Sequence, residues 1–410
     1  MTTVLERDLD TTAWAIGAPR LLAGLEQHAR LDVNAHLATH GAVPAADLSR
    51  LLAYLDAARI AGRGGAGFPL ATKMRALAAG PRRVVVNGTE SEPASRKDRT
   101  LLRRTPHLVL DGALAVAQAA GARDVVVAVH DEPAAHSLRA ALAERADGRR
   151  VRISTLTGGF VAGEARAVVR AIDGGAALPP GRRTPPTATG TLVSNAETFA
   201  QLAILLRVGP QRFAETGTRA EPGSTLLTVG GAVRRPGVVE IPIGTPLGIV
   251  LAAAGAPPQP QAIVVGGYHG SWLAPIPDIR LSRDGLAASG GTFGAGVLLV
   301  LDDTTCALGE LATVTGWLAA ESARQCGPCR FGLPALAADI AALAAGRPAV
   351  AAAFGHARAV DGRGACAHPT GAARFAISGL HLLRDETDRH LHAGGCGRPV
   401  RGQLPLAGAR

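Results

Sequence analysis

The sequence predicts an α/β protein with a mainly parallel sheet in its first half, a β-grasp-like module after it and a helical region at its end. Three observations predict this fold class. Buried β-branched runs alternate with helical stretches in the first half, which is typical of βαβ units. Short strands separated by Pro and Gly turns replace that pattern over residues 225–267. From Thr304 onward the apolar residues recur at helical spacing, and all five cysteines lie in this part.

The elements of the first half follow from apolar spacing. Residues 12–60 are expected to be helical, because apolar side chains recur every three to four positions around Leu51 and Leu55. A glycine-rich turn begins the segment 62–73 and precedes a further helix. The sequence VVVN at 84–87 is short and apolar, as expected of a strand that is buried on both faces. The other expected strands are 124–130 and 151–156, and the other expected helices are 107–120 and 197–207.

The second half divides into two parts. Only one expected helix, 247–254, interrupts the β runs of the first part, which indicates a compact β-grasp-like module. The second part is helical to the end of the chain. The expected domains are therefore 1–215 for an N-terminal helical segment with the α/β domain, 216–300 for the β-grasp module with its connecting strands, and 301–410 for the helical domain.

Composition limits the classes of function. The chain has 410 residues, a net charge of +10 and only 3% aromatic residues, and its arginines are scattered. This pattern disfavours nucleic acid as a partner and indicates either the bias of a high-GC genome, with a generally basic surface, or docking to an acidic electron carrier. No apolar run reaches the roughly 18 residues of a membrane helix. The first ten residues lack the apolar stretch of a secretory signal, so a cytoplasmic location is expected.

The cysteines indicate a metal or cluster site. Their number is odd and the chain looks cytosolic, so a disulfide framework is disfavoured. Cys326 and Cys329 form a C-x-x-C pair, and Cys366 is a third candidate ligand, a set that suits an iron–sulfur cluster. Zinc and a thioredoxin-like redox pair are the alternatives. We expect Cys306 to be a buried core thiol and Cys396 to be either a ligand or a tail residue.

Two further segments suggest contacts with a phosphorylated ligand. The segment GRGGAGFP, from Gly62, allows a close backbone approach to phosphate, although glycine clusters also form plain turns. Lys73 follows it, and it is one of only two lysines in the chain, which favours an anion or a flavin oxygen nearby. Glu90 and Glu92 follow a strand, where α/β sheets bind ligands, or else they lie in a solvated turn.

Taken together and in order, these segments resemble the FMN- and NADH-binding subunit of respiratory complex I, known as the 51 kDa or F subunit. Soluble NAD-reducing hydrogenases and NAD-dependent formate dehydrogenases carry the same module. The likeness runs from about residue 20 to 390 and includes GRGGAGFPxxxK at 62–73 and ESxxxCxPCRxG at 321–332. The matching positions between these two motifs include Val85, Val86, Asn87, Glu90, Glu92, Pro93, Lys97, Asp98, Arg99, Phe160, Gly163, Glu164, Val193, Ser194, Asn195, Glu197 and Thr198.

The resemblance implies a Rossmann-like FMN-binding domain, a soluble-ligand-binding β-grasp (SLBB-like) module and a helical iron–sulfur domain. It implies that FMN takes a hydride from NADH and that electrons then pass through the cluster to a partner carrier. No side chain is implied as a catalytic acid or base. The residues implied for FMN are Gly62, Arg63, Gly64, Gly65, Gly67, Lys73, Asn87, Glu90, Ser194 and Asn195. Those implied for NADH are Phe68, Glu92, Gly163 and Glu164, and those for the cluster are Cys326, Cys329 and Cys366.

The sequence also departs from the family pattern. Ala323 stands where the family has the first cluster cysteine, so the cluster is a four-iron cluster with a foreign ligand, a three-iron cluster, or absent. Cys306 or Cys396 is a candidate replacement. Ala165, Thr184 and Thr187 replace family residues of the NADH site. The alternative function is therefore an electron-relay or non-catalytic paralogue that keeps FMN.

The expected partners are NADH and an electron-carrier protein. The carrier is a ferredoxin-like protein, a membrane-bound reductase or a respiratory complex. Through such a partner the chain would sit peripherally at the inner face of the cell membrane.

Overall fold

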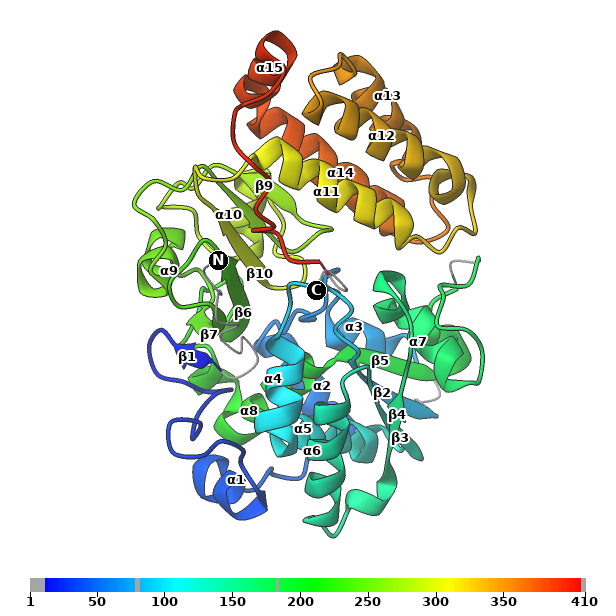
Figure 1. Cartoon of the computed structure of the whole chain (residues 1–410). Coiled ribbons are helices and arrows are strands. Elements are labelled where there is room, and N and C mark those ends of the chain that lie inside the picture. The colour runs from blue at the N-terminus through cyan, green and yellow to red at the C-terminus, as the bar shows by residue number, and fades with distance from the viewer. Residues whose placement is uncertain (1–11, 78–81, 182–183, 407–410) are drawn as a thin grey trace.

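The computed structural model describes residues 12–77, 82–181 and 184–406. The expectation about a secretory signal concerns the first ten residues and lies outside the described residues. Figure 1 shows two sheets with their helices in the lower and middle parts of the molecule and a helical bundle above them. In the described part, no helix combines the length and apolar character needed to cross a membrane.

The first sheet is entirely parallel, as the sequence predicts. Its strand order is β4 (Val151–Thr155), β3 (Asp124–Val129), β2 (Arg83–Gly88) and β5 (Thr191–Asn195). Alternate valines of β2 enter different cores, since Val84 packs in the large core and Val85 in a smaller core on the other face. Helices cover both faces, which explains why the strand is a continuous apolar run.

The expected helices of this half are present except near the N-terminus, and α4, α6 and α7 are additional. Residues 12–60 contain two helices and a three-residue strand, β1 (Ala13–Ala15), rather than one long helical segment. The strand forms because Trp14 is buried in the core of the second sheet and β1 pairs with β7 there. The helices are α1 (Val33–His40), α2 (Leu48–Ala57), α3 (Leu70–Arg75), α4 (Lys97–Arg104), α5 (Pro106–Ala120), α6 (Glu132–Ala143), α7 (Ala165–Ile172) and α8 (Ala196–Phe213).

The second sheet is mixed and has the order β1-β7-β6-β10-β8-β9. An antiparallel pair, β6 with β7, is followed by α9 at the expected position, and β10 returns parallel to β6. This arrangement confirms the β-grasp expectation. The elements are β6 (Ser224–Gly231), β7 (Gly237–Pro242), α9 (Leu247–Ala254), β8 (Ala262–Val265), β9 (Ser271–Leu273), α10 (Arg283–Ala288) and β10 (Val297–Leu301).

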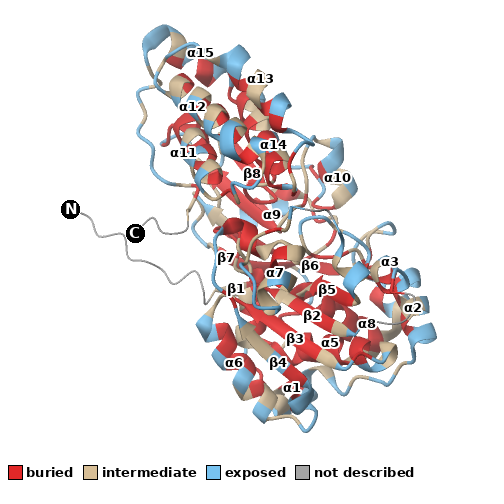
Figure 2. Ribbon diagram, turned by 90° about the vertical axis from the view of Figure 1, so that its right-hand side faces the viewer, coloured by how far each residue is buried: buried red, intermediate tan, exposed pale blue. Residues whose placement is uncertain are grey.

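The third part is helical, as the spacing predicts. Its core is built from apolar faces of neighbouring helices, which Figure 2 shows as buried surfaces facing one another. The segment after the last helix runs back to the start of α11, where the Cys306 backbone N–H donates to the Pro399 carbonyl at 2.8 Å. The elements are α11 (Ala307–Ala320), a short π-helix (Pro328–Gly332), α12 (Leu333–Ala344), α13 (Val350–Val360), α14 (His368–Leu382) and α15 (Arg384–Ala393).

One buried carboxylate anchors the N-terminal segment. Glu240, on β7, accepts hydrogen bonds from the backbone N–H groups of Arg20, Leu21 and Leu22, each at 3.0 Å. The Ser224 hydroxyl also donates to it at 2.6 Å. Because these donors replace the water lost on burial, the second sheet holds a chain segment that begins the first domain.

A buried ion network joins the two sheets. The Lys97 ammonium lies 3.0 Å from the Glu197 carboxylate and 2.9 Å from that of Asp98. Glu197 in turn accepts a hydrogen bond from the Thr225 hydroxyl of β6 at 2.9 Å. Burial acts against the charge, yet the two carboxylates together raise the pKa of Lys97. The network therefore links α4 and α8 of the first domain to the second sheet.

Lys97→Met is expected to destabilise the fold by about 3–5 kcal/mol, because it leaves two buried carboxylates, Asp98 and Glu197, without their shared cation. Denaturant unfolding followed by circular dichroism measures the change. Arg139→Ala is the matched control, since it breaks an exposed pair with Glu132 and is expected to change stability by less than about 1 kcal/mol. Equal effects of the two substitutions would contradict the structural role of the network.

Candidate active site

The glycine segment forms a closed loop between α2 and α3. The Gly62 N–H donates to the Phe68 carbonyl at 3.2 Å, and a Cβ at Gly62 would lie 2.6 Å from that same oxygen. Gly67 has a φ of +64°, which favours glycine. Phe68 is 50% exposed beside the loop. The segment thus presents backbone and one free aromatic ring rather than charged side chains.

Residues of the domain that contains the second sheet contact the glycine loop. The Arg283 guanidinium, at the start of α10, donates to the Gly62 carbonyl at 2.8 Å, and a Cβ at Gly67 would lie 2.2 Å from it. Gly65 faces Gly294 of the same domain. The sequence analysis missed Arg283, because nothing in the sequence distinguishes it among many scattered arginines.

Arg63, the arginine of the glycine loop, is directed into the protein interior. Arg63 is buried, and its guanidinium donates to the Ser224 carbonyl at 3.3 Å and lies 3.8 Å from Glu197. Its backbone N–H donates to the Thr198 hydroxyl at 2.9 Å. Arg63 therefore joins the glycine loop to the buried ion network.

The predicted asparagines meet at the carboxyl edge of the first sheet. In the register of β2 with β5, Asn87 stands opposite Asn195, and Ser194 directly precedes Asn195 on β5. The Asn87 amide donates to the Gly163 carbonyl at 2.9 Å, so it also ties down the segment before α7. Asn195 caps α8 by accepting from the Glu197 N–H at 3.0 Å. A Cβ at Gly64 would lie 3.8 Å from the Asn195 Cβ, so the glycine loop lies at the same edge.

Lys73 provides a half-buried positive charge at this edge. Its ammonium donates to the Val193 carbonyl of β5 at 2.9 Å, and burial lowers its pKa. No ion pair to a described carboxylate compensates it, in contrast to Lys97. Nearby in the strand, the Ser194 hydroxyl is buried and has no hydrogen-bond partner among the described residues. A half-buried cation and a buried, unsatisfied hydroxyl fit the anionic and polar groups of a flavin nucleotide.

The two glutamates have different environments. Glu90 is buried and accepts hydrogen bonds from the Ser95 hydroxyl, the backbone N–H groups of Asp98 and Arg99, and the Arg99 guanidinium. With a φ of +40°, it shapes the turn after β2. Glu92 accepts one bond from the Tyr268 N–H at 2.9 Å, and its other oxygen has no partner among the described residues. Glu92 therefore keeps a free acceptor.

The segment around Gly163 connects this edge to the cysteine region. Glu164 caps α7 through the N–H groups of Arg166 and Ala167. The Arg166 guanidinium donates to the Ala365 carbonyl at 3.4 Å, next to Cys366. The flavin-side residues and the cysteines are thus neighbours, although they are far apart in the sequence.

Cys326, Cys329 and Cys366 are brought together as predicted. Their thiol groups interact electrostatically, and Cys329 and Cys366 are buried. Among the described residues, the only set of ligand atoms that all lie within 4.8 Å of one another is a different one, so these three thiols are spaced more widely than a single tetrahedral ion requires. Ala323, in the connection before Cys326, offers no thiolate.

The expectation that Cys306 or Cys396 replaces the missing cysteine is wrong. Cys306 caps the start of α11, whereas Cys326 follows its end, and the 14 residues of this helix span about 21 Å. Cys396 lies beside Cys306 rather than beside Cys326. The expectation that Cys306 is buried is confirmed, since it is 3% exposed.

A histidine and aromatic cluster fills the space between the two regions, and the sequence analysis missed it. His269 and His368 share a hydrogen bond of 3.0 Å, and His368 also contacts the Leu318 carbonyl at 2.9 Å. Phe160 packs edge-on against His269 and Trp317. Burial lowers the pKa of His368 to about 4, so the ring is neutral at pH 7. The cluster links Phe160, just before Gly163, to His368, which is two residues after Cys366.

Family models match the chain in the same order as its parts. The Nuo51 FMN-binding domain matches residues 55–204, the SLBB domain matches 226–267, and the NADH-ubiquinone oxidoreductase-F iron-sulfur binding region matches 309–390. The F subunit of the Mycobacterium bovis NADH-quinone oxidoreductase is 30% identical over 380 residues, covering 84% of this chain and 85% of that protein. Its counterpart in Streptomyces coelicolor is 30% identical, with 84% of each chain covered.

Solved structures of an NAD+-reducing [NiFe]-hydrogenase have the same fold. The air-oxidised form superposes with a TM-score of 0.79 at 26% identity over 94% of this chain, and the H2-reduced form with a TM-score of 0.76 over 86%. The chain spans 68% and 64% of the length of those hydrogenase chains, respectively.

Glu92→Gln is expected to flatten the dependence of stability on pH. Burial raises the pKa of Glu92 to about 7 from its ordinary 4.5. Ionising this acid therefore opposes folding progressively as the pH rises from about 4.5 to 7, by about 3 kcal/mol in full. The neutral variant lacks that penalty. Unfolding free energies at pH 5 and pH 8 measure the difference, with exposed Glu132→Gln as the control. Parallel pH curves for Glu92→Gln and the parent protein would rule the effect out.

Proposed function

Because the chain belongs to the family of NADH-quinone oxidoreductase F subunits, we propose that FMN and NADH bind at the carboxyl edge of its first sheet. The chain is an oxidoreductase in which NADH is oxidised by FMN and electrons leave through an iron–sulfur cluster. The relay or non-catalytic alternative is not favoured. The observation that carries the placement is the half-buried Lys73, which has no carboxylate partner among the described residues, beside the unsatisfied Ser194.

We assign the FMN side to the inner part of this edge. Gly62, Gly64, Gly65 and Gly67 provide close backbone, and Lys73 provides a positive charge. Asn87, Ser194 and Asn195 supply polar groups from adjacent strand ends. Arg63 and Glu90 act through the backbone they hold, because their side chains are engaged with protein partners.

We assign the NADH side to the outer part. Phe68 offers an exposed ring for stacking, and Glu92 offers a free carboxylate oxygen for a hydroxyl or amide donor. Gly163 and Glu164 close this side next to the cysteines. When bound, FMN supplies the ability to accept two electrons as a hydride and to release them singly. The residues described here orient the two ligands and exclude water, and none is needed as an acid or base.

We propose that Cys326, Cys329 and Cys366 hold the cluster and that its fourth ligand is not a cysteine of the family motif. The physiological acceptor is then a carrier protein or a respiratory complex that docks near these cysteines. The net charge of +10 favours an acidic partner, and such docking would place the chain peripherally at the membrane through that partner.

The test is an anaerobic optical titration of the FMN- and iron-reconstituted protein with NADH. Stoichiometric bleaching of the flavin at micromolar NADH is expected. A flavin that dithionite bleaches but NADH does not would support the relay alternative instead. No flavin bound after reconstitution would overturn the site itself.

Lys73→Ala is expected to weaken FMN binding by about tenfold or more, since a charge-assisted hydrogen bond contributes about 1.5–3 kcal/mol. Fluorescence quenching of FMN during titration into apoprotein measures the affinity. Arg75→Ala, on the same helix and half exposed, is the control and should bind FMN like the parent. Unchanged affinity in Lys73→Ala would exclude this lysine from the site.

Ala323→Cys is expected to stabilise a four-iron cluster by restoring a fourth thiolate. Electron paramagnetic resonance after mild oxidation measures the three-iron signal, which should be strong in the parent and weak in the variant. Ala320→Cys, exposed at the last position of α11, is the control and should behave like the parent. Identical spectra for Ala323→Cys and the parent would show that position 323 does not face the cluster.

A further inference from the structure

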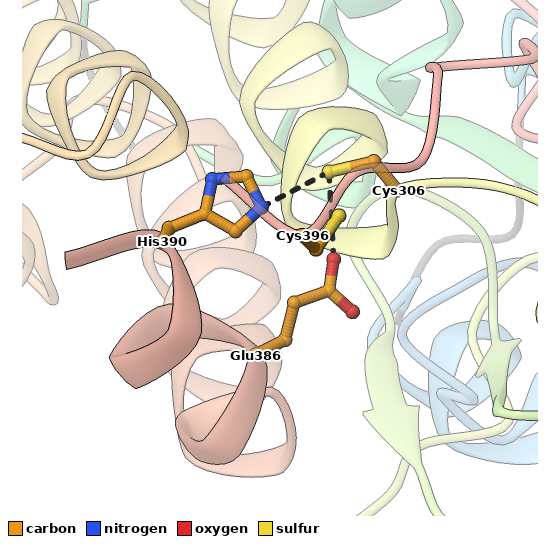
Figure 3. Close-up of side chains that lie close together, drawn as sticks. All are labelled: Cys306, Glu386, His390 and Cys396. Atoms are coloured by element: carbon orange, nitrogen blue, oxygen red, sulfur yellow. Dashed lines mark hydrogen bonds between the residues drawn. The ribbon is translucent and has the colours of Figure 1, made fainter. Parts of the chain in front are cut away.

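Four metal-ligating side chains lie together outside the site described above. The ligand atoms of Cys306, Glu386, His390 and Cys396 are all within 4.8 Å of one another, as Figure 3 shows. The Cys306 sulfur lies 3.4 Å from the Glu386 carboxylate and 3.4 Å from the His390 Nε2. Cys306, Glu386 and His390 are buried, and both cysteines are free thiols.

The surroundings fix these side chains in orientations that suit a metal ion. The His390 Nδ1 is 2.8 Å from the Ala344 carbonyl and donates to it, which leaves the Nε2 lone pair directed toward the sulfurs. The Leu308 N–H donates to one Glu386 oxygen at 3.0 Å, and the Arg398 guanidinium contacts the other. The Gly309 N–H donates to the Cys306 sulfur at 3.2 Å, which fixes the position of that sulfur at the start of α11.

We propose that Cys306, Glu386, His390 and Cys396 bind one Zn²⁺ ion, as a structural site separate from the iron–sulfur cluster. Zinc takes four S, N and O ligands at about 2.0–2.3 Å in a tetrahedron, which places the ligand atoms roughly 3.3–3.8 Å apart. The observed contacts of 3.4 Å match that spacing before any ion is added. An iron–sulfur cluster is too large for so tight a set. Two thiolates and one carboxylate exceed the charge of the ion by one, and Arg398 offsets this excess.

The ion would join the start of α11 to α15 and to the segment that directly follows α15. Glu386 and His390, on α15, stand 80 and 84 residues after Cys306, which caps α11. Cys396 belongs to the segment that runs back over residues 302–310. There the Glu310 carboxylate accepts from the backbone N–H groups of Arg401 and Gln403 at 3.1 and 3.0 Å. Closing such loops through a metal stabilises the helical region mainly by restricting the unfolded chain.

The test is metal analysis of the full-length protein purified under reducing conditions with Zn²⁺ present in the growth medium. One zinc per chain is expected by mass spectrometry of the metals, in addition to iron. Cys396→Ser, in the half-buried member of the set, should lower zinc below about a tenth of an equivalent and leave iron unchanged. Cys329→Ser is the matched control and should lower iron but leave zinc.

Co²⁺ gives a second readout on the parent protein, which does not depend on a variant folding. After removal of zinc, added Co²⁺ should produce the thiolate charge-transfer and tetrahedral d–d absorption bands of an S,S,N,O site. Absence of zinc together with absence of these bands would overturn the proposal. So would a Cys306–Cys396 disulfide in the native protein, iron in place of zinc, or zinc that disappears in Cys329→Ser and persists in Cys396→Ser.

Discussion

The position of the cofactor edge depends on the buried carboxylate of Glu197. It lies at the first turn of α8, where it pairs with Lys97 of α4 and accepts hydrogen bonds from Thr225 and Leu226 of β6. Through Arg63 it also reaches the glycine loop. An isolated charge at this depth would be strongly unfavourable, so each partner is held where the charge requires it. One set of ionic contacts therefore fixes the positions of the glycine loop, the strand ends and the second sheet relative to one another.

The two lysines of the chain have different partners, which indicates a structural role for one and a ligand-binding role for the other. Lys97 is surrounded by carboxylates, and its charge is satisfied within the protein. Lys73 reaches only a backbone carbonyl among the described residues, and burial works against its charge. A protein keeps such an unbalanced cation where a ligand supplies the missing negative charge. The same reasoning separates Glu90, which is satisfied by its own loop, from Glu92, which retains a free oxygen.

The sequence predicted those parts of the fold that depend on local patterns. Continuous valine runs indicated the parallel strands, because both faces of β2 are buried. The glycine loop and the strand-end asparagines were predicted through family motifs, and the structure brings them to one edge. The sequence could not indicate β1, because three residues are too few to show an alternating pattern. The pairing of β1 with β7 is decided by tertiary packing. Arg283 and the Cys306 set were missed for a related reason, since their contacts join distant segments without a short motif.

The long-range pairing of the N-terminal segment has a consequence for how the chain folds. Arg20, Leu21 and Leu22 reach Glu240 across 218 to 220 residues, and β1 joins the second sheet through β7. During synthesis the four strands of the first sheet can assemble before β7, the partner of β1, has left the ribosome. Closing so large a loop is slow, because its entropy is lost before its contacts form. We therefore expect β1 to pair with β7 late in folding, so that the two domains reach their final state in one coupled step.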